Sequence, residues 1–212
     1  MSLVGILTAI DGVESSLVKN FSFMGANSFN IQNRSSGFNL NRNAKRVRYE
    51  VINYKQAEEF KERFGRDAIV SMNSRNSRSA IAKRGSEKTN PNTSVIGGDE
   101  GYIDVAGYEI EEGRNLNKTD VDRNIAVCII GQEIKEKLFG ATNCINEHIR
   151  VGGVKLRVVG LFASKGGAFD FGGDRIVMVP VTLARAKFPR SNLSYNIGVS
   201  LKDVTTMDDI TA

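Results

Sequence analysis

The sequence has 212 residues, of which 41% are hydrophobic, and 29 basic against 24 acidic side chains give it a net charge of +5. This hydrophobic content supports a folded core and excludes a chain that is disordered throughout. The small basic excess is typical of an ordinary solvated surface and falls short of the positive charge of nucleic-acid-binding proteins. No apolar run approaches the roughly 20 residues that a membrane-spanning helix needs, so we expect a soluble chain as it stands.

The N-terminal residues predict a helix followed by a strand. Apolar side chains recur at steps of three and four over residues 4–24, which indicates an amphipathic helix that Gly25 ends, and a strand over 27–32 follows. The helix starts without a convincing cap, which suggests that it continues a longer one. Residues 34–48 are basic and polar and predict a loop. They do not alternate with aromatic side chains that could stack on bases, so we expect no nucleic-acid partner.

The next segment completes a compact unit of helices and strands. One strand is expected over 46–52 and another over 68–72. Between them, Asn53 with Gln56 three residues later forms a capping box, and the helix that begins there runs to Phe64. Three apolar residues form the expected buried stripe of this helix: Ala57, Phe60 and Phe64.

The middle of the chain predicts a passage into a second, β-rich unit. Residues 73–92 are polar and rich in Ser, Arg and Asn, the composition of a connection between lobes, with an extended ribbon around 79–84. Residues 125–130 are apolar at every position, as expected for a strand covered on both faces. In chain order we further expect a strand over 93–98, a helical turn over 102–106, a loop over 111–116, a turn capped by Thr119 and a helix over 132–139.

The C-terminal third contains the strongest local signal, a β-hairpin. Two β-rich runs, 149–151 and 154–162, are joined by Gly152-Gly153, a pair typical of a type I′ turn because both positions need a positive φ. The glycine-rich residues 164–173 follow as a flexible connection. After them we expect a strand over 175–179 that Pro180 closes, a short helix capped by Thr182 with Leu183, Ala186 and Phe188 on one side, and a strand over 195–201.

This succession of hairpin, glycine-rich loop, strand and Val-Pro-hydroxyl turn resembles the extracytoplasmic core domain of MacB-like permeases of ABC transporters. In that family the domain lies between the first two membrane helices, and the N-terminal helix continues the first of them. The resemblance extends in order and spacing over nearly the whole chain. It includes four further stretches: Gly25-Ala26-Asn27, Glu112-Gly113-Arg114 followed by Asp120-Val121, Ile130-Gly131, and Lys137-Leu138-Phe139-Gly140.

The resemblance implies a non-catalytic domain that relays motion between membrane helices and extracytoplasmic partners or cargo. Its implied partners are a cytoplasmic ABC ATPase acting through the membrane helices, a periplasmic adaptor protein and a second copy of the permease. The full-length protein would be anchored in the membrane with this domain in the periplasm or outside the cell. Family members export macrolides, toxins or peptides, move lipoproteins or control cell-wall hydrolases, and the sequence does not choose among these roles.

The residues themselves predict no catalytic, cofactor or metal site. Gly173 precedes an acidic residue and a strand, whereas a P-loop needs a Lys-Ser/Thr pair and a helix there. His148 is the single histidine, and no Gly-x-Ser-x-Gly elbow or Cys-x-x-Cys pair accompanies it. Adjacent carboxylates such as Asp99-Glu100 would point to opposite faces of a strand. Cys128 is expected to be a small buried hydrophobe, and its pairing with Cys144 stays open.

We therefore expect an α+β fold in which a mixed α/β lobe is built from both chain ends. This membrane-proximal lobe comprises residues 1–86 and 174–212, and a β-rich lobe of residues 87–173 is inserted into it. The strand over 175–179 should return to pair within the sheet of the first lobe. Because the first helix lacks a natural start, residues 4 and 212 should lie on the same side of the molecule.

The candidate contact with a partner is the glycine-flanked triplet Phe169, Asp170 and Phe171. Two phenylalanines are costly to leave exposed, so we expect them to pack on the second lobe or to contact a partner, with a solvated linker as the alternative. A different class of function also stays open. The chain could be a secreted hydrolase, or the substrate-binding module of one, that uses the cleft between the lobes.

Overall fold

The computed structural model describes residues 28–33, 50–65, 68–164 and 173–201. The helices of this part of the chain are α2 (Tyr54–Phe64), α3 (Tyr102–Ala106), α4 (Lys118–Asp122), α5 (Gln132–Phe139) and α6 (Val181–Lys187). The strands are β1 (Ser28–Ile31), β2 (Ala68–Ala80), β3 (Ala82–Arg84), β4 (Glu87–Lys88), β5 (Thr93–Gly98), β6 (Ile110–Gly113), β7 (Val127–Ile130), β8 (His148–Val151), β9 (Val154–Phe162), β10 (Ile176–Pro180) and β11 (Asn196–Leu201). None of the described helices is long and apolar enough to span a bilayer.

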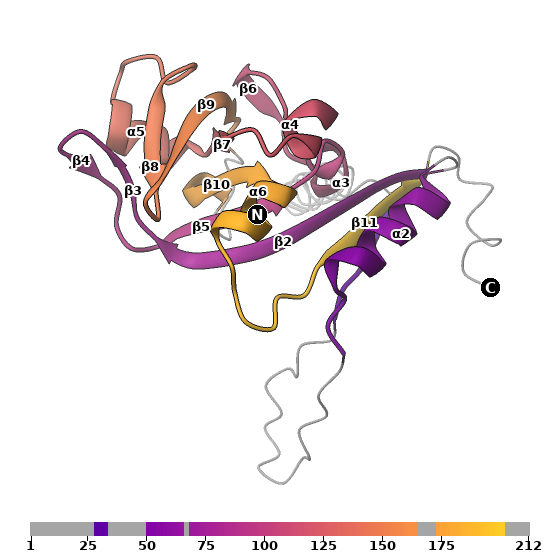
Figure 1. The fold of residues 1–212 in the computed structure, drawn as a ribbon. Helices are drawn as coiled ribbons and strands as arrows, with labels where there is room; N and C mark the ends of the chain where they lie inside the picture. The colour runs from indigo at the N-terminus through magenta and orange to yellow at the C-terminus, as the bar shows by residue number, and fades with distance from the viewer. Residues whose placement is uncertain (1–27, 34–49, 66–67, 165–172, 202–212) are drawn as a thin grey trace, which may run out of the picture.

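These strands form one mixed sheet in the order β1-β11-β2-β5-β10-β7-β9-β8-β3-β4, and β6 pairs with β9 outside this path. The α+β class expected from the sequence is confirmed. Figure 1 shows β2 as a long strand that connects the region of β3, β4 and α5 with the region of α2 and β11. The fold therefore depends on β2 for continuity from one end to the other.

Strand β2 continues through residues that the sequence assigned to a connection between lobes. Its residues 68–73 pair with β11 and its residues 73–80 pair with β5, so that Asn73 has a partner on each side. Two of the polar side chains that suggested a loop, those of Ser74 and Asn76, are buried and hydrogen-bonded. The Ser74 hydroxyl donates to Asn76 Oδ1 at 2.9 Å, and Asn76 Nδ2 donates to the carbonyls of Ala184 and Phe188 at 3.2 and 2.9 Å. A strand tolerates such residues when every polar group has a partner.

The pairing predicted for the strand over 175–179 is wrong. β10 pairs in parallel with β5 and antiparallel with β7, both of which fall in the residues assigned to the inserted lobe. All five residues of β10 are buried, which suits a central strand covered on both faces. The edges of β2 are meanwhile taken by β11 and β5. The division into lobes of residues 1–86 with 174–212 and of 87–173 stays a prediction.

The centre of the sheet buries side chains on both faces. In β7, Val127 and Ile129 belong to one hydrophobic cluster and Cys128 and Ile130 to another, as the alternation of side chains along a strand requires. The second cluster also contains residues of α5 and α6, and the first contains Ile103 of α3. A third cluster packs α2 against β2 and β11. The continuous apolar run at 125–130 thus predicted a doubly covered strand correctly.

Helix α6 lies very close to β5 at one position. A Cβ atom added to Gly97 would be 2.5 Å from Cβ of Ala184, 3.0 Å from Oγ of Ser74 and 3.2 Å from Cα of Val181. Such distances leave no room for a side chain on this strand residue. The absence of a side chain at Gly97 therefore sets how closely α6 approaches the sheet.

Several local predictions are confirmed. Asn53 caps α2, with its side chain accepting from the Gln56 backbone and Gln56 reaching back to the backbone of Asn53. The hairpin of β8 and β9 turns at Gly152 and Gly153, whose φ angles are 54° and 86°. The predicted helix over 132–139 corresponds to α5. These features depend on neighbouring residues, and the sequence therefore predicts them well.

Other local predictions are wrong. Asn117, not Thr119, caps α4. Helix α6 begins directly after Pro180, and the Thr182 hydroxyl donates to the carbonyl of Val121 and does not cap the helix. Phe64 is 36% exposed, and Ala184 replaces Ala186 on the buried side of α6.

The described chain enters and leaves the fold at one edge of the sheet. β1 and β11 pair antiparallel, and Ser28 lies opposite Ser200. The helix expected over 4–24 and the positions 4 and 212 lie outside the described residues. Their arrangement stays a prediction.

Candidate functional site

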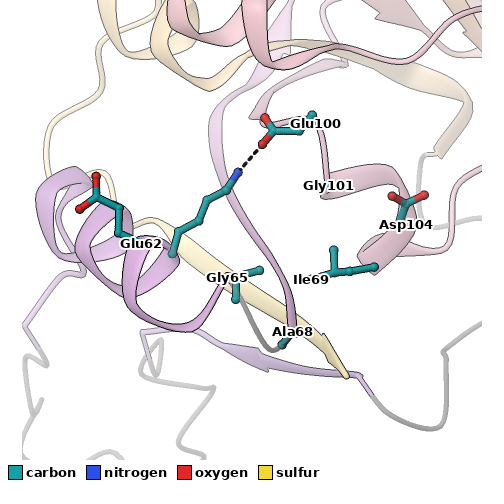
Figure 2. A pocket seen from close by; sticks show the side chains of 9 residues that line it. Glu62, Gly65, Ala68, Ile69, Glu100, Gly101 and Asp104 are labelled. Atoms are coloured by element: carbon teal, nitrogen blue, oxygen red, sulfur yellow. Dashed lines mark hydrogen bonds and ion pairs between the residues drawn. The ribbon is translucent and has the colours of Figure 1, made fainter. Parts of the chain in front are cut away.

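A pocket of about 460 Å³ lies between the C-terminal end of α2, the start of β2 and α3. Figure 2 shows Glu62 on the α2 side, Gly101 and Asp104 on the α3 side, and Ile69 between them. Glu100 also lines the pocket and points toward α2. The pocket thus combines carboxylates from two helical regions with apolar side chains from a strand.

Beside the pocket, one lysine joins two consecutive carboxylates. Lys61 of α2 places its Nζ 2.6 Å from Oδ2 of Asp99 and 2.8 Å from Oε1 of Glu100. We call these three residues the acid-lysine triad. The Asp99 side chain is 1% exposed, whereas those of Lys61 and Glu100 are 26% and 35% exposed. The triad therefore reaches from a fully buried position to the wall of an open pocket.

The position of Asp99 follows from where β5 ends. The last residue of β5 pairs with Asn73, so β5 offers no backbone partner to the residue before it in β2. The Asp99 carboxylate takes that place: its Oδ2 accepts from the backbone N–H of Met72 at 2.9 Å, and its Oδ1 accepts from the Ser71 hydroxyl at 2.7 Å. With Lys61 this gives a buried carboxylate three donors, which is how proteins retain a charge away from water.

Burial and the opposing charges act differently on the three ionisable groups. Burial raises the pKa of Asp99, although Lys61 and the hydrogen bonds from Met72 and Ser71 act against it. Burial alone would lower the pKa of Lys61, but the charges of Asp99 and Glu100 outweigh it and raise that pKa. Burial opposes ionisation of Glu100 as well, yet its hydrogen bonds to Lys61 and to the backbone, together with the charges of Lys61 and Lys118, outweigh burial and lower its pKa. Lys61 therefore stays protonated well beyond neutral pH.

The sequence did not predict this triad. Asp99 and Glu100 were expected to point to opposite faces of a strand, and that expectation is wrong because both residues lie in the turn between β5 and α3. One signal was present in the sequence: the acidic pair is preceded by two glycines and followed by Gly101. Glycines on both sides of an acidic pair indicate a turn, where neighbouring side chains can converge.

Hydrogen bonds extend from the triad to α4. Asn115 Nδ2 donates to the backbone carbonyl of Glu100 at 2.8 Å. Its neighbour Arg114 places Nη1 2.6 Å from Oδ2 of Asp120, whose side chain is 3% exposed. Asp120 also accepts from the backbone of Asn117 and so completes the cap of α4. Polar contacts thus run from α2 to α4 without interruption.

The structure describes only some of the other candidate residues. Phe169, Asp170 and Phe171 lie outside the described residues, so their contact with a partner stays a prediction. His148 is exposed, and both cysteines are buried and unpaired. Among the described residues no group of His, Cys, Asp and Glu could hold a metal ion.

Comparison with known proteins gives a consistent result. Residues 1–212 match the family model described as the MacB-like periplasmic core domain. The macrolide export ATP-binding/permease protein MacB of Bdellovibrio bacteriovorus is 24% identical over 213 residues, which cover 99% of this chain and 31% of that protein. The pyoverdine export ATP-binding/permease protein PvdT of Pseudomonas aeruginosa is 29% identical over 105 residues, or 49% of this chain and 16% of that protein. The chain thus spans at most about a third of the length of these relatives.

Solved structures agree in fold. The periplasmic region of MacB from Actinobacillus actinomycetemcomitans has a TM-score of 0.69 at 20% identity, covering 92% of this chain and 84% of that one. The extracellular domain of the ABC-type transporter YknZ from Gram-positive bacteria has a TM-score of 0.59 at 21% identity, covering 75% and 78%. At these identities the likeness concerns the fold alone.

Proposed function

This chain belongs to the family of MacB-like periplasmic core domains, and from that premise we propose that it is the extracytoplasmic domain of an ABC transporter permease. The resemblance inferred from the sequence is thereby confirmed as to family. The proposed role is to relay motion between membrane helices and extracytoplasmic partners or cargo, without catalysis in the domain itself. A cytoplasmic ABC ATPase would supply the energy through those helices.

One geometric observation supports a mechanical role. The described chain enters through β1 and leaves through β11, and these neighbouring strands are hydrogen-bonded side by side with Ser28 opposite Ser200. A displacement applied to both connections therefore arrives at a single edge of the sheet. From there β2 carries it directly to β5 and the centre of the fold, because β2 bonds to β11 with one half and to β5 with the other.

The alternative function, a secreted hydrolase or its substrate-binding module, receives less support. Hydrolysis needs an accessible nucleophile or a free acid-base pair. In the candidate site Ser71 and Asp99 are both fully buried and bonded to each other. Lys61 is held by two carboxylates. These three groups satisfy one another, so none of them is free to act as a nucleophile or as a general base.

The remaining parts of the proposal concern place and partners. The domain would lie in the periplasm or outside the cell, in a protein anchored in the membrane. It would act with a periplasmic adaptor protein and a second copy of the permease. Phe169 and Phe171 remain the proposed contact residues.

Deletion of the domain in the full-length protein tests this proposal. Because Ser28 lies opposite Ser200, a short glycine-serine linker in place of residues 29–199 keeps the flanking segments at their normal separation. In cells that also contain the ATPase, we expect the deleted protein to reach the membrane and support ATP hydrolysis while export is lost. The matched control inserts the same linker between Gly152 and Gly153, in an exposed turn, and should retain export. Undiminished export by the deletion variant would refute the proposed role.

A further inference from the structure

Four basic side chains form a row across one end of the sheet. The last four strands in the sheet order are β9, β8, β3 and β4. Lys83 of β3 lies opposite Lys88 of β4 on one side and opposite Arg150 of β8 on the other. Arg150 in turn lies opposite Lys155 of β9. All four residues are exposed, and we call them the basic row.

The basic row lies on the face of these strands that is turned away from the core. The alternate residues of the same strands, among them Ala82, Ile149 and Leu156, pack with α5 in the hydrophobic core on the other face. Beside the row, the outward residues of β8 and β9 are His148 and Arg157, which also lie opposite each other. Every outward residue of these paired segments is therefore Lys, Arg or His, and none is acidic.

This arrangement is unfavourable for the domain on its own. Like charges directly opposite each other in a sheet are destabilising, and the basic row contains three such pairs in succession. No ion pair connects a member of the row to another residue that the structure describes. The positive charge of the row is thus not compensated within the described part of the chain.

Protection of a sheet edge accounts for only part of the row. Lysine on an edge strand keeps other chains from pairing with it, and β4 is the last strand in the sheet order. This role suits Lys88. It does not account for Lys83 and Arg150, because each of them has a paired strand on both sides. Like charges at two neighbouring interior positions indicate a surface for an anionic partner.

We propose that the basic row binds an acidic α-helix of a partner protein, which lies across β4, β3, β8 and β9. Neighbouring strands are about 4.8 Å apart, so the backbone positions of the four charges span about 14 Å. A helix with one carboxylate per turn repeats about every 5.4 Å, and four such carboxylates span about 16 Å. Lysine and arginine side chains are long and flexible enough to accommodate the difference. Aspartate or glutamate at positions i, i+4, i+7 and i+11 of the partner helix would each meet one member of the row.

The place of the row favours a protein partner over a lipid surface. Figure 1 shows β3, β4 and β8 at one end of the sheet and β11 with α2 at the other end. The described chain enters and leaves through β1 and β11, so the row lies away from the connections that would lead to the membrane helices. The inference deepens the proposed function, because it names the chemistry of an extracytoplasmic partner, and it rests on that function for this orientation.

Binding of two synthetic peptides to the 212-residue chain tests the proposal. Both peptides have about 18 residues and the same composition, and the same side-chain cross-links hold them helical. The first carries four glutamates on one face, at i, i+4, i+7 and i+11, and the second carries them distributed around the helix. In fluorescence anisotropy at low ionic strength, the first peptide should bind roughly tenfold more tightly than the second. Added salt should weaken this binding, because the pairs are exposed.

A double variant and its matched control identify the surface. Lys83→Gln combined with Arg150→Gln should weaken binding of the first peptide roughly tenfold. It should also raise Tm by about 2 °C, because it removes all three like-charge pairs. Lys55→Gln combined with Arg63→Gln removes the same net charge from exposed positions of α2 and should weaken binding by less than about twofold. Equal binding of the two peptides, an equal effect of the two double variants, or a fall in Tm on neutralising the row would overturn the proposal.

Two further measurements separate the helix from a lipid surface and the surface from the proposed function. Vesicles of phosphatidylglycerol and phosphatidylcholine should not displace the first peptide, and displacement by them would assign the row to lipid and overturn the helix. In the full-length protein, Lys83→Gln with Arg150→Gln should impair export. If the peptide binds as expected but this variant exports normally, the binding surface stands and its part in the proposed relay is wrong.

Discussion

Replacing Gly97 by alanine should destabilise the chain by a specific steric conflict between β5 and α6. The added Cβ atom would lie 2.5 Å from Cβ of Ala184, whereas ordinary contacts begin at 3.4 Å, so the two elements must separate by about 1 Å. Ser74 and Val181 also lie within 3.2 Å of the new atom, so a sideways shift brings no relief. Overpacking of this kind costs about 3 kcal/mol.

Urea unfolding followed by far-ultraviolet circular dichroism measures this loss. A cost of about 3 kcal/mol corresponds to a fall in Tm of roughly 6–12 °C for a chain of this size. Gly101 provides the matched control, since its φ is −87° and its added Cβ would meet only ordinary contacts beyond 3.4 Å. Gly101→Ala should therefore stabilise the fold by about 0.5 kcal/mol through a less flexible unfolded chain.

A double variant identifies the atom responsible. Ala184→Gly removes the methyl group that the new side chain would meet first, so adding it to Gly97→Ala should recover part of the lost stability. The recovery stays incomplete because Ser74 and Val181 remain close. If Gly97→Ala and Gly101→Ala changed stability equally, or if Ala184→Gly recovered nothing, the steric account of this contact would be refuted.

Three further predictions concern charge and exposure. Because Lys61 helps to lower the pKa of Glu100, the ionised Glu100 side chain stabilises the fold fully above its ordinary pKa of 4.5, and this contribution is lost as the pH falls below that value. The free energies of unfolding of the wild type and of Glu100→Gln should therefore converge at low pH. A difference that stayed constant with pH would contradict this. Arg114→Met leaves the buried Asp120 carboxylate without its cation and should lower the free energy of unfolding in urea by about 3 kcal/mol. Lys55→Met removes an exposed ion pair and should lower it by less than about 0.5 kcal/mol. Equal losses of stability in the two variants would refute the role of burial. A thiol reagent should modify neither native cysteine in the folded chain and both in urea, and rapid reaction without urea would show that they are accessible.

The parts of the fold that depend on neighbouring residues could be predicted from the sequence. The capping box at Asn53, the glycine turn between β8 and β9 and the doubly covered strand β7 each follow from residues close together in the chain. The family could also be inferred, because short stretches in the right order carry information even when none is specific alone. Local chemistry was sufficient for these features.

The candidate site could not be predicted in the same way, because it depends on contacts between distant residues. Lys61 and Asp99 are separated by 38 positions, and they meet because β5 ends one residue short of covering Met72. The polar half of β2 was assigned to a connection because its composition resembles a loop. Its buried hydrogen bonds to Ala184 and Phe188 exist only once α6 has packed against the sheet.

The strand order has a consequence for how the chain folds. Only a few neighbouring strands in the sheet are also neighbours in the sequence, and β2 must wait for β11, more than a hundred residues later, to cover one of its edges. Pairings between such distant segments form slowly, because a long loop has to close before any contact compensates for it. During synthesis the half of β2 that pairs with β11 therefore emerges with an unpaired edge, which is a template for association with other chains. We expect biogenesis to be the stage at which this chain most needs protection from aggregation.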